Sequence, residues 1–326
     1  MSSRPLSLTP RGYRRVTLFA LCALAFIVVT GGAVRLTGSG LGCPDWPTCS
    51  QQRVVAPLEY HAMVEFVNRT ITGLVSVAVM LAVLGSLWRT PRRRDLTWLS
   101  LGLVAGVVGQ IVLGGLTVLF DLAPPFVMAH FGVSMLLLWC AVVLHDRAAL
   151  PDESDRPVRA GSVDRDQARM TRLLTVAAAV VIVLGTVVTS SGPHGGDERA
   201  ERLPFALHAV TRLHGVAVML FLVMTVLTLV SLARSGVGSE VLRRAEVLLA
   251  AVVAQAAVGY AQYFTRLPPL LVGIHIAGAT AVWVAVLRLD LAAVGISLSW
   301  SPPPKPPQSW TSPASTRSPS PTGRGS

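Results

Sequence analysis

The chain has 326 residues, of which 52% are hydrophobic and 14% charged, and its mean hydropathy is +0.58. A soluble domain carries about 25% charged residues, so this composition excludes an ordinary soluble protein and predicts one that crosses a membrane several times. The formal net charge of +11 comes mainly from arginines between the apolar segments, and we interpret it as a signal for membrane orientation and not for nucleic-acid binding.

Eight apolar runs are long enough to span a bilayer, which requires about 20 residues. They cover approximately residues 16–36, 64–88, 96–119, 125–146, 171–190, 207–233, 242–264 and 269–290. The first run leads into a glycine-rich loop and seven more runs follow, so we expect a retained helix and not a cleaved signal peptide. The sequence therefore predicts an all-α integral membrane protein with eight transmembrane helices.

Arginines gather before the first run and after the second, fourth and sixth runs. Because cytoplasmic loops are enriched in Lys and Arg, both termini are predicted to be cytoplasmic. The Pro/Ser-rich C-terminal segment carries too little apolar sequence to fold, so we expect a disordered tail. The expected organisation is a cytoplasmic N-terminus 1–15, a first four-helix half 16–146, a cytoplasmic linker 147–170, a second four-helix half 171–290 and a cytoplasmic tail 291–326.

The two halves repeat each other in sequence. Gln110, Gly114, Pro124 and His130 recur at one constant offset as Gln255, Gly259, Pro269 and His275. Upstream, Asn68 corresponds to His214, and residues 37–42 resemble residues 190–195. Each half has an even number of helices, so both halves run the same way through the membrane. The repeat predicts two four-helix bundles related by a pseudo-twofold axis along the membrane normal.

Four histidines lie near the outer ends of the even-numbered runs: His61 and His130 in the first half, His214 and His275 in the second. Two imidazoles that face each other across an apolar bundle are typical axial ligands of haem iron, whereas zinc and copper sites usually recruit additional Cys, Asp or Glu. A hydrogen-bonded packing role is the alternative for one buried histidine, but the repeat favours ligation. His208 lies six residues before His214 and cannot share its helix face, so we expect it at the membrane surface.

The halves differ at Asn68, where the second half has His214. The complete histidine pair of the second half suits electron transfer. In the first half His130 remains, and His61 and Glu65 lie one to two turns before Asn68 on the same helix stripe. A site with a weaker ligand and a nearby carboxylate suits reaction with oxygen or proton handling. We therefore predict that the first half is the reactive one.

The loop after the first run is rich in glycine but lacks the strand and the Lys-Ser/Thr of a phosphate-binding loop. It leads into Cys43 and Cys49, which we expect on the oxidising outer side, where they can form a disulfide. Whether such a disulfide is a structural staple or a redox-active pair is open at this point. Arg69 lies at the outer membrane surface and either pairs with a carboxylate of a bound ligand or snorkels.

These residues resemble the haem A synthase family, especially its actinobacterial branch. The resemblance rests on the segment from Thr37 to Cys49, on Glu65-Phe-Val-Asn-Arg69, on Gly-Pro-His194-Gly-Gly-Asp, and on His130, His214 and His275. It covers nearly all of residues 16–290. It implies an eight-helix membrane enzyme that oxidises the C8 methyl of haem O to a formyl group, by successive hydroxylations, to make haem A for terminal oxidases.

The resemblance also implies ligands and partners. Haem b would be held in the C-terminal half by His214 and His275, and the haem O substrate would lie in the N-terminal half near His130. The implied surroundings are the lipid of a bacterial cell membrane, an unidentified electron donor, haem O synthase and cytochrome oxidase assembly factors. The family's loop cysteine pair corresponds to Cys43 and Cys49.

One position departs from the family pattern, because the histidine of its Glu-x-x-His motif falls on Asn68. His61 is the obvious substitute ligand, and Glu65 is the expected acid/base residue. Asn68 and Arg69 are expected to border the substrate haem. Two other functions remain possible from the sequence: a non-catalytic diheme b-type electron carrier, and a haem transport or assembly protein.

Overall fold

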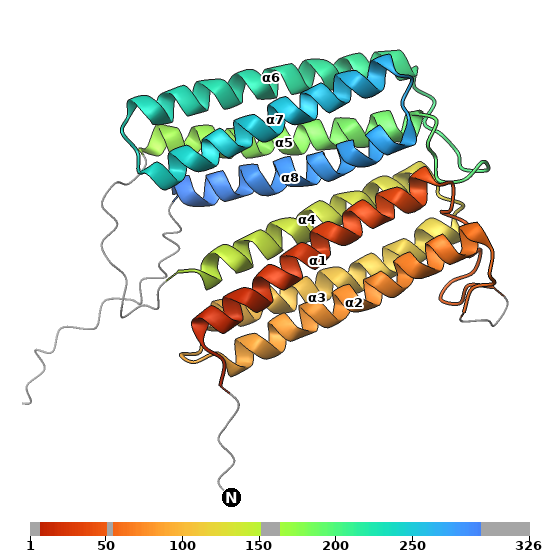
Figure 1. Cartoon of the computed structure of the whole chain (residues 1–326), viewed down its shortest axis with the longest axis horizontal. Coiled ribbons are helices and arrows are strands. Elements are labelled where there is room, and N and C mark those ends of the chain that lie inside the picture. The colour runs from red at the N-terminus through yellow and green to blue at the C-terminus, as the bar shows by residue number, and fades with distance from the viewer. Residues whose placement is uncertain (1–6, 51–54, 151–163, 295–326) are drawn as a thin grey trace, which may run out of the picture. The chain divides into compact units, whose positions relative to one another are not determined.

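The computed structural model describes residues 7–50, 55–150 and 164–294, and every predicted apolar run is a helix in it (Figure 1). The helices are α1 (Pro10–Leu36), α2 (Tyr60–Trp88), α3 (Arg94–Leu119), α4 (Pro124–Ala148), α5 (Arg165–Ser191), α6 (Leu207–Arg234), α7 (Ser239–Phe264) and α8 (Pro269–Val294). Residues 151–163 of the predicted linker and 295–326 of the predicted tail lie outside the described residues, and 291–294 continue α8.

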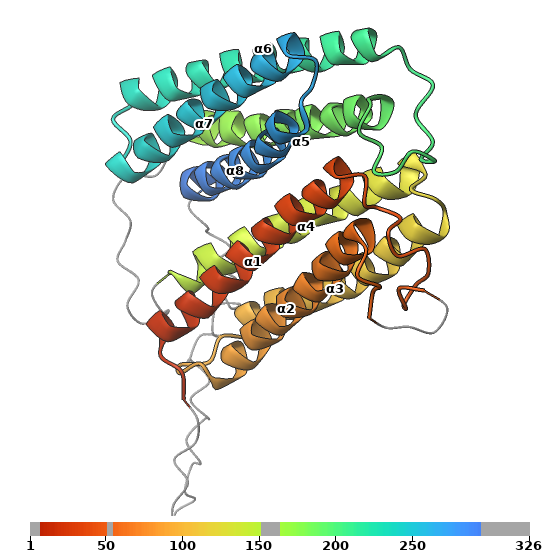
Figure 2. The same cartoon turned by 45° about the vertical axis from the view of Figure 1, so that its right-hand side comes forward.

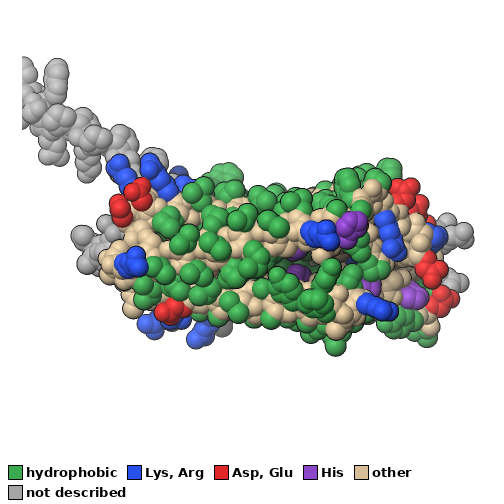
Figure 3. All heavy atoms as spheres, turned by 90° about the horizontal axis from the view of Figure 1, so that it is seen from above, with side chains coloured by type: hydrophobic (Ala, Val, Ile, Leu, Met, Phe, Trp, Pro, Cys, Tyr) green, Lys and Arg blue, Asp and Glu red, His purple; other side chains and the backbone are tan. Residues whose placement is uncertain are grey.

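All eight helices are long and apolar enough to cross a membrane. They contain between 25 and 29 residues, which at about 1.5 Å per residue exceeds the roughly 30 Å hydrocarbon core of a bilayer. Figure 3 shows apolar side chains along the length of the helices and charged side chains mainly toward their two ends. The chain is therefore a multi-pass membrane protein.

The helix starts follow local capping chemistry. The Thr9 side chain accepts a hydrogen bond from the Gly12 N–H at 3.1 Å, and Pro10 occupies the first turn of α1. Asp164 and Gln167 form a capping box at the start of α5. These caps allow α1 and α5 to begin in polar sequence, several residues before the apolar runs begin.

Each half packs its helices in the same way. Along the chain each helix packs on the next, and the first helix of each half packs on the fourth, which closes the bundles α1–α4 and α5–α8. Between the halves, α8 packs on α1 and α4, and α4 also packs on α5 (Figures 1 and 2). At this junction Trp283 of α8 donates a buried hydrogen bond to the Met135 carbonyl of α4 at 2.9 Å. The pseudo-twofold axis itself stays a prediction.

The loops after α1 and α5, which repeat each other in sequence, contact each other directly. The Gly40 N–H donates to the Gly196 carbonyl at 2.8 Å. Arg35, at the end of α1, donates to the carbonyls of His194 at 2.7 Å and Thr189 at 3.1 Å. Arg35 therefore connects the two halves at this end of the molecule.

The opposite end carries the arginine-rich connections. Arg93 pairs with Asp95 at 2.7 Å and donates to the Arg147 carbonyl at 3.0 Å, which joins the start of α3 to the end of α4. Arg244 of α7 lies 3.5 Å from Asp146 of α4, which joins the two halves here. The connections after the second, fourth and sixth helices thus share one end, as the arginine pattern requires.

Candidate active site

The second half brings His214 of α6 and His275 of α8 close enough to interact electrostatically. Each ring lies against a helical glycine of a neighbouring helix. A Cβ added at Gly185 of α5 would lie 3.3 Å from Cε1 of His214, and one at Gly259 of α7 would lie 3.3 Å from Cε1 of His275. Because glycine has no side chain, each imidazole can pack directly on the adjacent helix.

Gln255 holds the backbone beside His275. Its Nε2 donates to the His275 carbonyl at 2.8 Å and so connects α7 to α8. Gln255 and Gly259 are four residues apart and lie on the same face of α7. One turn of α7 therefore fixes the helix that carries the histidine, and the next turn leaves room for its ring.

The first half repeats this arrangement around His130. Gln110 of α3 donates to the His130 carbonyl at 3.0 Å, and it also donates to Ser134 at 2.6 Å. A Cβ added at Gly114 would lie 3.3 Å from Cε1 of His130. The sequence repeat is thus matched by the contacts that orient the two histidines.

Asn68 of α2 lies where the repeat has His214, and no imidazole is packed against a glycine at this level of the described structure. The Asn68 Oδ1 atom is buried and has no hydrogen-bond partner among the described residues. On α1, a Cβ at Gly32 would meet Ile276, whereas a Cβ at Gly31 would meet nothing within 4 Å. Asn68 also lines a groove of about 490 Å³ between α1 and α2.

His61 lies at the start of α2, beside the loops that follow α1 and α5. Its exposed ring shares a 2.9 Å hydrogen bond with Ser39, and it is within electrostatic range of Asp197 in the second half. Burial raises the pKa of Asp197, but hydrogen bonds from Arg199 and the nearby positive charges outweigh it, so this pKa is lowered. Seven residues separate His61 from Asn68, which is about 10 Å along the helix axis. The structure does not bring His61 to the level of Asn68.

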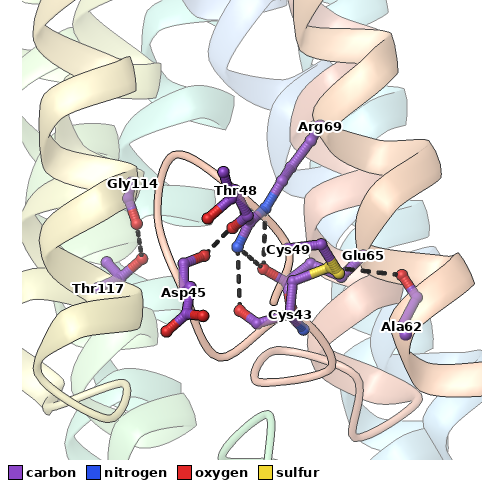
Figure 4. A network of polar contacts seen from close by, with 9 residues as sticks. All are labelled: Cys43, Asp45, Thr48, Cys49, Ala62, Glu65, Arg69, Gly114 and Thr117. Carbon is purple, nitrogen blue, oxygen red and sulfur yellow. Dashed lines mark hydrogen bonds and ion pairs between the residues drawn. A yellow bond between two sulfur atoms is a disulfide. The ribbon is translucent and has the colours of Figure 1, made fainter. Parts of the chain in front are cut away.

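Glu65 and Arg69 form a buried ion pair under the cysteine loop (Figure 4). The Glu65 carboxylate accepts hydrogen bonds from the Cys43 N–H at 2.8 Å and from Arg69 at 2.5 and 3.1 Å. Arg69 also donates to the carbonyls of Cys43, Asp45 and Thr48, each at 3.1 Å. The guanidinium therefore fastens the loop to α2, a contact that the sequence does not reveal.

Cys43 and Cys49 form a disulfide, as predicted, and both are almost completely buried. The tip of the same loop carries Trp46, whose ring lies over Gly115 of α3, where an added Cβ would be 2.7 Å from it. Gly115 is adjacent to Gly114, which packs on His130. The disulfide loop thus extends from α2 to the helix that orients His130. Sequence reasoning missed Trp46, although a tryptophan between two prolines in a short disulfide loop was a visible signal.

His194 and His208 lie at the same end of the molecule in different surroundings. His194 shares a 2.8 Å hydrogen bond with the Leu267 carbonyl, and His208 is exposed at the start of α6. Its position at the membrane surface stays a prediction. Figure 3 shows histidine side chains toward one end of the apolar surface, some of them within a hollow.

The donor set fits a haem iron held between imidazoles. The Nδ1 atoms of His130, His214 and His275 are buried without partners in the described part of the chain. The described residues bring together no group of three or more His, Cys, Asp or Glu side chains, the arrangement that a zinc site requires. The paired imidazoles of the second half match the bis-histidine ligation of haem.

Comparison with known proteins places these features in a family. The COX15-CtaA model, described as cytochrome oxidase assembly protein, matches residues 14–63 and 55–193. Similar proteins include the heme A synthases of Shouchella clausii (26% identical over 55% of this chain and 59% of the relative), Lysinibacillus sphaericus (27%, 40% and 44%) and Bacillus cereus strain AH187 (28%, 50% and 52%). The chain spans about half the length of these curated relatives. Because the family model matches more than half of the chain, the protein belongs to the COX15-CtaA family.

Proposed function

We propose that this protein is a haem A synthase, which oxidises the C8 methyl of haem O to a formyl group for the haem of terminal oxidases. The relatives named above carry this activity in their names. The observation that carries the proposal is the unequal repeat. One half has two glycine-packed imidazoles, and the other has a single such imidazole, with a buried carboxylate near the position that lacks the second.

In the second half, His214 and His275 would hold the iron of haem b. Haem b would supply an electron-transfer centre there. Gly185 and Gly259 let the two rings pack on their neighbouring helices, and Gln255 holds the backbone of His275 in place. The apolar bundle keeps water away from this centre.

In the first half, haem O lies beside His130, whose backbone and ring are held by Gln110 and Gly114. Glu65 is the acid/base residue of this site. As a buried carboxylate it accepts a proton from the methyl-bearing edge or stabilises positive charge that develops there. Arg69 serves as its counter-ion and keeps the disulfide loop over the same end of the bundle.

The arginine-rich end faces the cytoplasm of a bacterial cell, and the disulfide loop faces the oxidising outer side. Three connections with clustered arginines at one end support this orientation, as does a disulfide at the other. An electron donor passes electrons to haem b. Haem O synthase acts before this protein, and cytochrome oxidase assembly factors act after it.

Expression of the chain with a supply of haem O, followed by mass spectrometry of the extracted haems, tests the proposal. We expect a formyl-bearing product from the intact chain. Replacing His275 with Ala should abolish the low-spin haem b spectrum as well. An unchanged porphyrin in the intact chain would contradict the enzyme function and would favour a diheme carrier or a haem transport protein.

A further inference from the structure

We propose that the first-half haem site has a single protein imidazole, from His130, and that its face toward Asn68 is kept open for a small uncharged diatomic ligand. The inference rests on the proposed function, because it assumes that a haem occupies this half. It goes further by assigning Asn68 a role of its own, as the residue that borders the open position.

The glycine–imidazole contacts show where the structure places histidine rings and where it does not. Three times in the described structure a histidine ring packs on a helical glycine of a neighbouring helix, with Cε1 3.3 Å from the position of an added Cβ. At the fourth level the repeat offers Asn68 on α2, and the α1 residue that corresponds to Gly185 is Gly32. A Cβ at Gly32 would lie 2.9 Å from the Ile276 side chain of α8, so an aliphatic side chain and no histidine ring packs on this glycine.

The side chain of Asn68 is a poor substitute for the missing imidazole. Its side chain is shorter than that of histidine, and a neutral amide is a poor ligand for haem iron compared with imidazole. Its Oδ1 atom is buried without a partner among the described residues, so no described group holds the amide oxygen in place. A diatomic ligand has no proton to donate, so the amide NH2 would be the group that donates a hydrogen bond to a molecule at the adjacent position.

His61 does not fill the position in this structure. It is about 10 Å from Asn68 along the axis of α2, it is exposed, and its ring is engaged by Ser39. The nearby carboxylate of Asp197 favours the imidazole at the outer loops as well. For His61 to become a ligand, these contacts would have to break.

The groove beside Asn68 offers a route of entry. It has a volume of about 490 Å³ and lies between α1 and α2, and the residues that line it are mostly apolar. Val34, Met63, Val67 and Ile71 are among them. Uncharged diatomic molecules enter apolar spaces readily, whereas water and ions do not, so this groove selects for the ligand class that an open haem position accepts.

Carbon monoxide is the probe that tests the open position. The full-length protein is purified with haem b, loaded with haem O, reduced with dithionite, and its absorption difference spectrum is recorded with carbon monoxide. We expect carbon monoxide to bind the haem O fraction only, because His214 and His275 close both faces of haem b. In Asn68→His the carbon monoxide spectrum should disappear and a second low-spin signal should arise.

The repeat offers a matched control in His214→Asn, which recreates the first-half arrangement in the second half. It should let carbon monoxide bind haem b as well, without changing the response of the haem O fraction. His61→Gln should leave the carbon monoxide spectrum of haem O unchanged. If haem O binds carbon monoxide in His61→Gln but not in the intact chain, His61 is the ligand and the inference is overturned.

Carbon monoxide binding and formation of the formyl product test the inference and the proposed function separately. Formyl product together with no carbon monoxide binding to haem O would overturn the inference and leave the enzyme function standing. Carbon monoxide binding that is lost in Asn68→His, together with an unchanged porphyrin, would defeat the enzyme function and leave the open position standing. Should Asn68→His fail to fold, the His214→Asn and His61→Gln spectra still decide the question.

Discussion

The ion pair between Glu65 and Arg69 should control how often the disulfide loop opens. Cys43 and Cys49 are almost completely buried, so a reductant reaches their disulfide only when the loop leaves α2. Arg69 makes three hydrogen bonds to loop carbonyls, and Glu65 makes one to the Cys43 N–H. Changes at either residue should therefore appear in the rate of reduction, which follows the population of the open loop.

The free energy by which the pair holds the loop closed follows from the burial of its two side chains. Removing one member of a buried ion pair costs about 3–5 kcal/mol. The Arg69 side chain is 24% exposed and that of Glu65 is 7% exposed, so Arg69→Met should lie at the lower end, at about 3 kcal/mol. Since about 1.4 kcal/mol is a factor of ten, reduction should be about 100-fold faster. Glu65→Gln keeps an acceptor for the Cys43 N–H and should cost about 1–2 kcal/mol.

The assay is reduction of the purified protein by a phosphine, followed by thiol alkylation and mass spectrometry. The double variant Glu65→Gln/Arg69→Met contains no unpaired charge, so its effect should be smaller than the sum of the single effects by about 1–2 kcal/mol. Additive effects, or a reduction rate in Arg69→Met equal to that of the intact chain, would refute the view that this pair fastens the loop.

Three further predictions concern other parts of the structure. Gly259→Val should displace the His275 ring and remove the haem b spectrum, whereas Gly109→Val, at a glycine of α3 where an added Cβ meets nothing within 4 Å, should not. Trp283→Phe removes a buried donor between α8 and α4 and should lower the free energy of unfolding by about 1–2 kcal/mol, measured by thermal denaturation in detergent. The pKa of Asp197 is lowered in the folded protein, so its stabilising effect is present at neutral pH and is lost as the pH falls through that pKa; Asp197→Asn should remove this part of the acid sensitivity of the melting temperature.

Hydropathy was sufficient to predict all eight helices, because no other segment of comparable length is apolar enough to cross a bilayer. It did not predict where the helices begin. α1 starts at Pro10 and not at residue 16, because the Thr9 cap stabilises a polar first turn that hydropathy does not register. The internal repeat indicated which glutamines, glycines and histidines correspond, but only the structure shows that glutamine and glycine position the histidine.

The sequence predicted which residues share one stripe of α2, but it did not predict which groups surround each of them along the helix. The spacing of His61, Glu65 and Asn68 places them on one stripe, yet His61 contacts the loops that follow α1 and α5, through Ser39 and Asp197. The i, i+4 spacing of Glu65 and Arg69 permits an ion pair, but the sequence alone favours a ligand carboxylate or snorkelling for Arg69, whereas in the structure it pairs with Glu65. The loop carbonyls that Arg69 binds were not predictable, because backbone acceptors leave no trace in the sequence.

The most direct test compares the haems extracted from the intact chain and from Glu65→Ala, each expressed with a supply of haem O. We expect haem b together with the formyl-bearing haem from the intact chain. From Glu65→Ala we expect haem b with unmodified haem O. An unmodified porphyrin in the intact chain, or loss of haem b in Glu65→Ala, would contradict the assignment of haem O oxidation to the first half and haem b binding to the second.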